Sequence, residues 1–519
     1  MKADRQQTKI APPIAFDSNR FVLLVLLGLT VLRTAALAIS PLELGVDEAQ
    51  YWLWSQNPDF GYFTKPPLIA WVIGTAHWLF GHSAMAVRLP ACWLQLATAL
   101  VLWQTASWLY GPRAGRLTAL IWISLPAVGL GSFLISTDTP LLLAMALALL
   151  AVAGSVCGKI PPARAMIYAG IALGVGMLAK YAAIYGLFGF MLIWASGRHH
   201  PNPIIQGRHL LLAIAACLIT VSPNLIWNLM HDFSTMRHLG DNANLAKQTH
   251  DLGQSLIFLI GQAGVAGPLV FFLMLGIIFA SRHEKHAGWL IWMALPVIGL
   301  ISLQAYLSEA NANWAMAAYP ALSIWLGGWL GSDDNQKTLL LLPRRWLGLG
   351  AIGLNFTLTI GLLLATMAGS LGPLTPASDP LRRLRGWQAL AQDIKPHLAA
   401  HQTSRIIADR RATAALLSWH FYGHDVTIMI HDRDGVPSNH FEANHSWQHR
   451  AGLPLLVLSG SSTPPIMPPI KWQDNPSQSK IMISRNKSRD LYIHKGIEWR
   501  SQKSWPPLLR AILQLVLLC

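Results

Sequence analysis

The residues best suited to chemistry gather in two short stretches, each beside an apolar segment. The first, LGVDEAQYWLWSQNPDFGYFTKPPLIAW (44–71), holds the adjacent carboxylates Asp47 and Glu48 and, further on, the isolated cation Lys65. The second, STDTP, holds Asp138 between two threonines. A carboxylate can act as a general base, and a lysine can stabilise charge on a departing phosphate. The three acids are therefore candidates for general bases, and the lysine is a candidate for binding an anion.

The position of Lys65 is unusual because Pro66 and Pro67 follow it directly and predict the start of a helix. The N-terminus of a helix carries the positive end of the helix dipole, so a cation there is unfavourable by roughly 0.3–1 kcal/mol. An anion bound at that end, most naturally a phosphate, would explain the lysine. The alternative is that the side chain only extends to the membrane interface.

The acids also have simpler interpretations. Asp47 could cap a helix that begins at Glu48, since Asp is a preferred N-cap residue. That interpretation accounts for neither Glu48 nor Lys65. Asp138 precedes Pro140 by two residues and could likewise be an ordinary helix cap.

Three further segments place polar residues beside apolar runs. In LAKYAAIY, Lys180 lies between two short apolar segments, where a cation needs a partner, an anionic ligand or an interfacial position. The loops HDFSTMRHLGDNANL and SEANANWAMAAYP are either ordinary solvated loops or suited to binding sugar hydroxyls and phosphate. The candidates for binding an anion such as phosphate are Lys65, Lys180 and Arg237, and those for binding other parts of a substrate are Tyr62, Tyr181, His231, His238, Asp241, Asn242, Glu309 and Asn313.

The composition shows what kind of protein must position these residues. Of 519 residues, 53% are hydrophobic and only 12% are charged, whereas a soluble protein carries about 25% charged residues. The chain is therefore expected to be a polytopic membrane protein. Its net charge of +15 lies mostly in short loops between apolar runs, which indicates membrane orientation and not a nucleic-acid partner.

Apolar runs predict about eleven transmembrane helices within 21–371, after a cytoplasmic N-terminus at 1–20. Alternate loops carry most of the cations, and the remaining loops carry most of the acids. Because loops rich in Lys and Arg stay in the cytoplasm, the two stretches with catalytic candidates are expected on the outer face. The outer loop 40–83 is expected to carry the active site.

The character of the chain changes after about residue 371. The segment 372–505 is polar and mixed, with short strand-like runs at 405–409, 426–430, 453–460 and 480–484 and helical patterns at 387–400 and 412–421. We expect a small soluble α/β domain there, on the outer face. The apolar tail 506–519 is too short to span a membrane comfortably, and whether it inserts is left open. The predicted fold class is thus an all-α polytopic membrane protein with a small C-terminal α/β domain.

Some functions are disfavoured by the motifs. Gly348, Gly350 and Gly353 spell GxGxxG, but that motif needs a preceding strand, and here it lies inside an apolar span. The sequence contains neither a P-loop nor HExxH. No cofactor is assigned. A divalent metal is left open, with Asp47 and Asp138 as candidate ligands, because carboxylates suit hard cations.

The motifs DEAQYWLWS, GYFTKPPL and STDTPLL resemble those of the GT-C fold glycosyltransferases. The resemblance is to the dolichyl-phosphate-mannose–protein mannosyltransferases and the bacterial aminoarabinose lipid A transferases, of the type of bacterial families 39 and 83. It covers about 20–370 and is strongest over 44–145. Thr64 departs from the pattern, since relatives often carry an acid there, and the C-terminal region is too divergent for any role to be carried over.

The resemblance implies a role for three positions. The acid of the first outer loop is catalytic in that family, which maps to Asp47 with Glu48 beside it. The lysine before the prolines contacts donor phosphate, which maps to Lys65. The acid of the second outer loop lies in the active site, which maps to Asp138.

Nucleotide sugars are not present outside the cytoplasmic membrane of a bacterium. A transferase that acts on that face is therefore expected to use a polyprenyl-phosphate sugar as its donor. The expected reaction is an inverting single displacement with Asp47 as the base. Lipid A, another envelope glycan or a protein remains open as the acceptor, and the last would make the enzyme a protein O-mannosyltransferase. A lipid flippase or transporter is the alternative from another class, although paired broken helices and midplane charges are not evident.

Overall fold

The computed structural model describes residues 18–243, 250–280, 286–332, 338–339, 342–371, 379–432, 435–465, 467, 470–484 and 487–499. The chain divides into two compact units. The first comprises Met1–Pro41 and Trp54–Gly372, and the second comprises Leu42–Leu53 and Pro373–Cys519. The predicted apolar tail at 506–519 lies outside the described residues.

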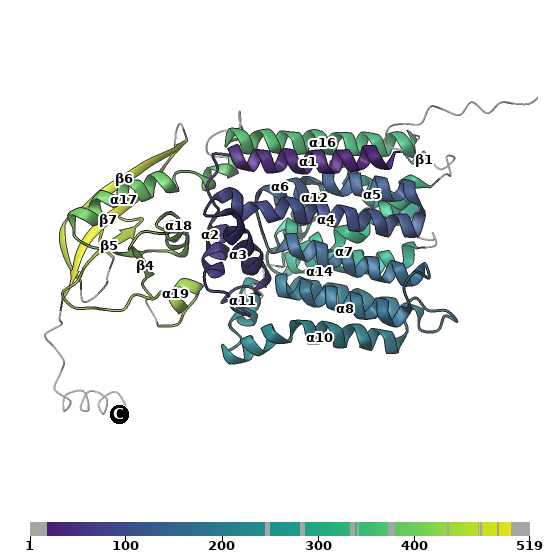
Figure 1. Ribbon diagram of the computed structural model, residues 1–519, viewed down its shortest axis with the longest axis horizontal. Coiled ribbons are helices and arrows are strands. Elements are labelled where there is room, and N and C mark those ends of the chain that lie inside the picture. Colours follow the sequence, from purple (N-terminus) through teal and green to yellow (C-terminus); the bar gives the residue numbers. More distant parts are fainter. Residues whose placement is uncertain are drawn as a thin grey trace, which may run out of the picture. The chain divides into compact units, whose positions relative to one another are not determined.

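The first unit is helical (Figure 1). Its helices are α1 (Asn19–Ile39), α3 (Leu68–Phe80), α4 (Ala84–Tyr110), α5 (Pro112–Ser124), α6 (Pro126–Phe133), α7 (Asp138–Val156), α8 (Pro162–Ala179), η2 (Tyr181–Ala183), α9 (Ile184–Gly197), α10 (Gly207–Met230), α11 (Ser234–Ala243), α12 (Leu252–Ala266), α13 (Pro268–Ala280), α14 (Ala287–Leu307), η3 (Ala312–Ala318), α15 (Tyr319–Gly331) and α16 (Arg344–Ala368). Two short strands, β1 (Thr338–Leu339) and β2 (Leu342–Pro343), pair in antiparallel register before α16.

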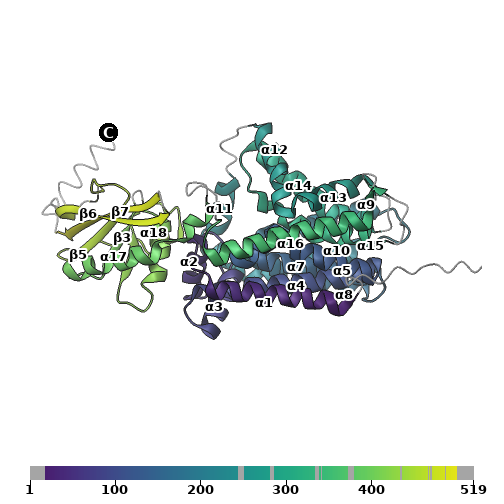
Figure 2. The same ribbon diagram turned by 90° about the horizontal axis from the view of Figure 1, so that it is seen from above.

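Among the described residues, seven helices are long and apolar enough to cross a membrane, or up to nine if each bent pair counts as one span. The chain is therefore a multi-pass membrane protein. The predicted count of eleven is not confirmed, because several apolar runs fold as shorter pieces. At about 1.5 Å per residue, α9 with its 14 residues spans roughly 21 Å, less than the roughly 30 Å of a hydrocarbon core. The α12–α13 pair bends by 113° (Figure 2).

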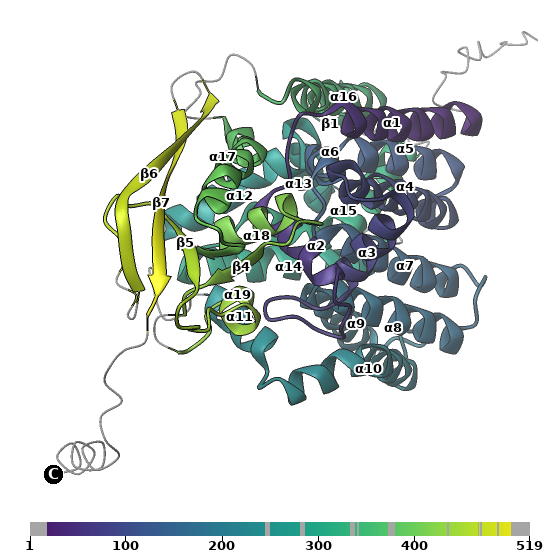
Figure 3. The ribbon, with the colours of Figure 1, turned by 60° about the vertical axis from the view of Figure 1, so that its left-hand side comes forward.

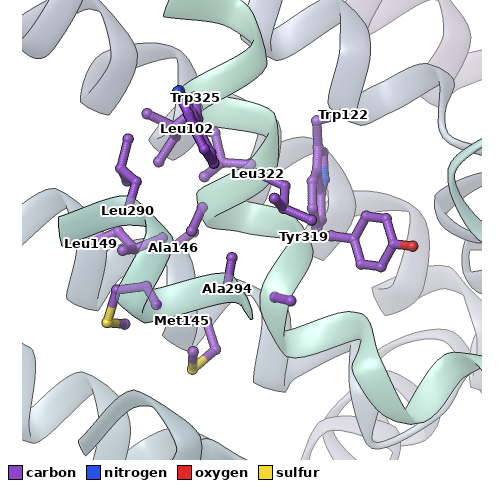
Figure 4. Close-up of a cluster of buried hydrophobic side chains, with 14 of the residues drawn as sticks. Leu102, Trp122, Met145, Ala146, Leu149, Leu290, Ala294, Tyr319, Leu322 and Trp325 are labelled. Carbon is purple, nitrogen blue, oxygen red and sulfur yellow. The ribbon is translucent and has the colours of Figure 1, made fainter. Parts of the chain in front are cut away.

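The core of the first unit lies where long helices pack side by side. Figure 4 shows Trp122 of α5, Met145 of α7, Leu290 of α14 and Trp325 of α15 within one buried cluster. Small residues let helices approach closely elsewhere. A Cβ added at Gly170 of α8 would lie 2.2 Å from the backbone oxygen of Ala213 in α10, so a larger residue would push these two helices apart.

The span formed by α5 and α6 is broken, with a bend of 56° at Leu125. A break frees backbone carbonyls, which need donors inside a membrane. Arg33 of α1 donates from Nη2 to the carbonyl oxygen of Ile123 at 2.9 Å. Thr359 of α16 donates from Oγ1 to the carbonyl oxygen of Ser124 at 3.1 Å. Side chains from two other helices thus stabilise the break, and α6 leads from it toward the loop before Asp138.

The second unit contains a five-stranded mixed sheet. Its strands are β3 (Arg405–Ala408), β4 (Thr427–Ile430), β5 (Pro454–Ser459), β6 (Ile470–Ser484) and β7 (Lys487–Glu498). The order is β4-β3-β5-β7-β6, with β3 parallel to both of its neighbours and β7 antiparallel to both of its own.

Helices pack against this sheet, and Figure 3 shows α17 and α18 on one side of it. The helices of the second unit are α2 (Val46–Ser55), η4 (Pro380–Leu384), α17 (Trp387–Ala400), α18 (Arg411–His420) and α19 (His440–Asn444), although the last two residues of α2 belong to the first unit. The expected α/β character is confirmed, including four of the strands and both predicted helices. β7 was not predicted. Its sequence, KSRDLYIHKGIE, lacks a clear alternation of polar and apolar residues.

The broken span offers a test of how membrane helices tolerate freed carbonyls. Changing Thr359 to Val keeps the side-chain shape but removes the donor to Ser124, and we expect the free energy of unfolding to fall by about 0.5–2 kcal/mol. Thr357→Val is the matched control, since the exposed Thr357 hydroxyl bonds only within its own helix, to Gly353. The measurement is unfolding in detergent micelles, and equal effects of the two changes would contradict this account of the break.

Candidate functional site

Three polar side chains of the first unit meet at the ends of helices. Lys180 Nζ lies 2.7 Å from Oδ1 of Asp138, and Asn313 donates from Nδ2 to Oδ2 of the same carboxylate at 2.9 Å. The side chains of Lys180 and Asp138 are 22% and 15% exposed. Both oxygens of Asp138 therefore have a partner, and the lysine remains accessible enough to meet a ligand.

The helix order explains why these residues meet. Asp138 lies in the first turn of α7, where a carboxylate suits the positive end of the helix dipole. Lys180 is the C-cap residue of α8, where a cation suits the negative end. Because α8 returns antiparallel beside α7, the start of one helix and the end of the other share one face. Asn313, from η3, completes the group.

The loop before α3 is held by hydrogen bonds around Tyr62. The Tyr62 hydroxyl donates to the carbonyl oxygen of Trp54 at 3.0 Å and accepts the backbone N–H of Asp59 at 3.1 Å. The two aromatic rings of Tyr62 and Trp54 stack at 4.8 Å. Burial raises the pKa of Tyr62 to about 12, so the hydroxyl keeps its proton as a donor. The Tyr62 backbone N–H donates to the carbonyl of Lys65 at 3.1 Å, which folds the loop back on the candidate phosphate-binding lysine.

The same loop is tied to α10 and to the residue after Lys180. Asn224 donates to the carbonyl oxygen of Phe60 at 2.7 Å and accepts the Tyr181 hydroxyl at 2.6 Å. Asn228 donates to that hydroxyl at 3.0 Å. Tyr181 directly follows Lys180, so one chain of hydrogen bonds connects the Lys65 loop with the Asp138–Lys180 pair.

The two adjacent acids of the first stretch have different surroundings in the second unit. Glu48 is buried, and its Oε2 accepts the backbone N–H of Gly45 at 2.8 Å, which caps the start of α2. Asp47 is 63% exposed and accepts a hydrogen bond from Nη2 of Arg411 at 3.0 Å. Asp47 is therefore the acid that is open to a substrate, whereas Glu48 has a structural contact.

Glu43 anchors the segment that carries these acids to α17. Its carboxylate accepts the backbone N–H groups of Gly386, Trp387 and Gln388 at 3.0, 2.7 and 3.0 Å. These are donors at a helix N-terminus, where a carboxylate is favoured. Burial by itself would raise the pKa of Glu43, but His420, whose Nε2 lies 3.5 Å away, and the backbone donors outweigh it and lower the pKa below 4.5.

The remaining predicted residues are less closely grouped. His231 stacks on Trp227 at 4.0 Å, and both Arg237 and Glu309 are exposed. The predicted substrate-binding residues His238, Asp241 and Asn242 fall on α11, but their side chains lie outside the described part of the chain. Within the first unit the structure thus brings together Asp138, Lys180, Tyr181, Asn313 and the Lys65 loop, and Asp47 belongs to the second unit.

A metal centre has no ready set of ligands. Across the described ranges, no three His, Cys, Asp or Glu side chains lie close enough together to hold a metal ion. The carboxylate oxygens of Asp138 bind Lys180 and Asn313, and Asp47 binds Arg411.

Several residues that build the site were not predicted from the sequence. Asn224 and Asn228 are four residues apart in an otherwise apolar helix, and such intramembrane polar pairs commonly mark functional regions. That signal could have identified them. Arg411 had no such signal, because it lies 364 residues from Asp47 in a mixed polar domain.

Comparisons with known proteins extend these observations. A family model described as dolichyl-phosphate-mannose-protein mannosyltransferase matches residues 64–227. The lipid A galacturonosyltransferase RgtD of Rhizobium johnstonii is 34% identical over 442 residues, which covers 82% of this chain and 88% of the relative. The 442 aligned residues outnumber the residues of the first unit, so the similarity extends into the second unit.

Two solved structures share the fold. ArnT from Cupriavidus metallidurans in the apo state has a TM-score of 0.62 at 14% identity, and the match covers 91% of this chain and 97% of that one. ArnT from the same organism bound to undecaprenyl phosphate has a TM-score of 0.64 at 15% identity, covering 92% and 98%. Identities this low establish similarity of fold alone.

The Glu43 anchor predicts a pH dependence of stability. Because the folded-state pKa lies below 4.5, the folded chain binds fewer protons than the unfolded chain just below that pH. The stabilisation is therefore fully present well above the ordinary pKa of a glutamate and is lost as the pH falls through the lower folded-state pKa of Glu43. We expect Glu43→Gln to unfold at a lower temperature than the wild type at pH 7, with a difference that shrinks below pH 4.5.

Thermal unfolding followed by tryptophan fluorescence measures this difference. Glu442→Gln is the control, since Glu442 is a carboxylate of the same unit that bonds only to Ser438 nearby. A pH-independent difference between the wild type and Glu43→Gln would contradict the assignment.

Proposed function

The chain belongs to the GT-C fold family of membrane glycosyltransferases that includes the lipid A galacturonosyltransferase RgtD, and from that membership we propose that it transfers a sugar from a polyprenyl-phosphate donor to lipid A. The observation that carries the proposal is the 34% identity over more than four fifths of each chain. The name of that relative makes galacturonic acid the first sugar to test. The ArnT structure with undecaprenyl phosphate supports a donor of that lipid class.

In this proposal Asp47 is the general base. The acceptor hydroxyl gives its proton to the carboxylate while its oxygen attacks the anomeric carbon of the donor sugar. The bond between that carbon and the phosphate oxygen breaks, and polyprenyl phosphate leaves with the bonding electrons. A single displacement of this kind inverts the anomeric centre, and it needs one base and no protein nucleophile.

Lys65 and Lys180 stabilise the negative charge that develops on the leaving phosphate. Such preorganised charges are usually the largest catalytic contribution. Asp138 and Asn313 hold Lys180 in place, because the carboxylate contacts its ammonium group at 2.7 Å and accepts the amide at 2.9 Å. Asp138 thus acts on the donor through the lysine, and the partial exposure of Lys180 leaves room for a phosphate oxygen.

We propose that the reaction takes place on the periplasmic face of the bacterial inner membrane. The loop between α7 and α8 carries Lys159, and Arg164 lies at the start of α8. Asp138 and Lys180 lie at the other end of this antiparallel helix pair. Because Lys- and Arg-rich loops stay cytoplasmic, the end with Asp138 and Lys180 faces the periplasm.

A protein acceptor is the second candidate, favoured by the description of the family model that matches 64–227. The test uses the purified protein in lipid nanodiscs with undecaprenyl-phosphate galacturonic acid, labelled in the sugar, and either lipid A or a Ser/Thr-rich peptide. The proposal expects labelled lipid A and release of undecaprenyl phosphate. Labelled peptide alone would replace lipid A with a protein acceptor, and an intact donor that only changes leaflet would indicate a flippase.

The base assignment predicts a large effect of Asp47→Asn. The amide keeps the shape but cannot take the proton, so we expect kcat to fall by about 10²–10⁴-fold with little change in the KM for the donor. Asp425→Asn serves as a control, because Asp425 is an exposed acid of the same unit. Full transfer activity of Asp47→Asn would remove Asp47 as the base.

If Lys180 binds the donor phosphate, removing the lysine at one end of α8 should reduce activity much more than removing the lysine near the other end. Lys180→Met removes the cation from the proposed phosphate site, and we expect kcat/KM for the donor to fall by about 10²–10³-fold. Lys159→Met is the matched control at the opposite end of the helix, where the ammonium lies 5.6 Å from the Trp108 ring. Steady-state kinetics with varied donor measures both, and equal losses would argue against donor binding by Lys180.

A further inference from the structure

The segment that carries the proposed base is built into the C-terminal part of the chain. Residues Leu42–Leu53 belong to the same compact unit as Pro373–Cys519, although more than 300 residues separate them in sequence. The Glu43 carboxylate, described above, holds the start of the segment at the N-terminus of α17. The Glu43 backbone N–H also donates to the carbonyl of Leu384 at 2.9 Å.

Arg411 contacts the catalytic face of α2 with both ends of its guanidinium group. Nη2 donates to Oδ1 of Asp47 at 3.0 Å, and Nη1 donates to Oε1 of Gln50 at 2.6 Å. Asp47 and Gln50 are three residues apart and therefore neighbours on one helix face. Gln50 is fully buried, whereas Asp47 is 63% exposed. The guanidinium group thus forms a fork: Nη1 bonds a buried side chain, and Nη2 bonds the exposed carboxylate.

An aromatic contact holds the same segment one turn further on. Trp52 of α2 is 1% exposed and meets the rings of Trp419 and Tyr422 edge to face at 4.9 and 5.2 Å. Trp419 lies near the end of α18, the helix that begins at Arg411. A single helix of the C-terminal domain therefore contacts α2 through a polar fork at its start and an aromatic cluster at its end.

We propose that Arg411 is a positioning residue for Asp47, and that the C-terminal domain serves to orient the base, an inference that rests on the function proposed above. An exposed aspartate samples several rotamers, and each misdirected rotamer reduces catalysis. The guanidinium fork selects one rotamer by its contact with Oδ1. Oδ2 is then the oxygen assigned to the acceptor proton. Because Arg keeps its charge and its planar geometry, it suits this use better than Lys.

The alternative is that Arg411 binds an anionic substrate directly, since it is 37% exposed. The two cases differ in their coupling to Asp47. A positioning residue has no effect once the group it positions is inactive, whereas a substrate-binding residue still does.

A double-mutant cycle separates them, using the full-length protein in the transfer assay above. We expect Arg411→Ala to lower kcat by about 10–100-fold, with the KM for the donor changed less than twofold. In the Asp47→Asn background the same change should have no further effect. A rise in KM at unchanged kcat, or an equal loss in both backgrounds, would overturn the proposal.

The neighbouring Arg410→Ala is the matched control. Arg410 is 65% exposed and bonds Asp409, so its removal should leave kcat near the wild-type value. Arg411→Lys keeps the charge without the fork and should recover only part of the activity. This variant also keeps the proposal testable if Arg411→Ala folds poorly.

Hydrogen–deuterium exchange gives a readout that does not depend on turnover. Amides of 46–53 should exchange faster in Arg411→Ala than in the wild type, and Arg410→Ala should leave them unchanged. Unchanged exchange in Arg411→Ala would overturn the proposal. If the wild type transfers no sugar, the proposed function fails, and if Asp47→Asn stays active, the base assignment fails. If both hold and the cycle is additive, only the positioning inference fails.

Discussion

A charged side chain beside apolar helices needs an oppositely charged or hydrogen-bonding partner, and this constraint organises the membrane unit around Asp138 and Lys180. Asp138 and Lys180 are 42 residues apart in sequence and 2.7 Å apart in space. Neither could remain without a partner at low cost, because an isolated buried charge is expensive. The antiparallel pair α7–α8 brings them together, and helix dipoles favour an acid at the start of one helix and a cation at the end of the other.

Neutral polar groups extend the same principle around this pair. Asn224, Asn228 and Tyr181 satisfy one another's hydrogen bonds, and Asn224 also holds the loop that precedes Lys65. Arg33 and Thr359 supply donors to the carbonyls freed at the break in the α5–α6 span. In each case a polar side chain of the helical unit forms a hydrogen bond with a backbone or side-chain group of another segment. These hydrogen bonds stabilise two segments that are not helical, the loop before Lys65 and the break between α5 and α6.

In the second unit the proposed base is held by packing and hydrogen bonds and not by a need to neutralise a buried charge. Asp47 is exposed, so desolvation does not dictate its partner, and the contact with Arg411 must instead be held by its surroundings. Those surroundings are the buried Gln50, the Trp52–Trp419 contact and the carboxylate of Glu43 at the start of α17. The mixed sheet and packed helices of the second unit provide a support for such a residue, as functional groups generally require.

The sequence by itself determined the class of protein, the apolar runs, four C-terminal strands with the helices α17 and α18, and the residue types that suit phosphoester chemistry. These follow from local hydrophobicity, periodicity and charge, which act over a few residues at a time. Only the tertiary structure decided which polar groups meet. It broke or shortened predicted spans where Leu125 and Gly267 interrupt the helices, gave Glu48 a capping contact, and joined Asp47 to Arg411, 364 residues away. Such contacts depend on how whole helices and sheets pack, and no local pattern in the chain carries that information.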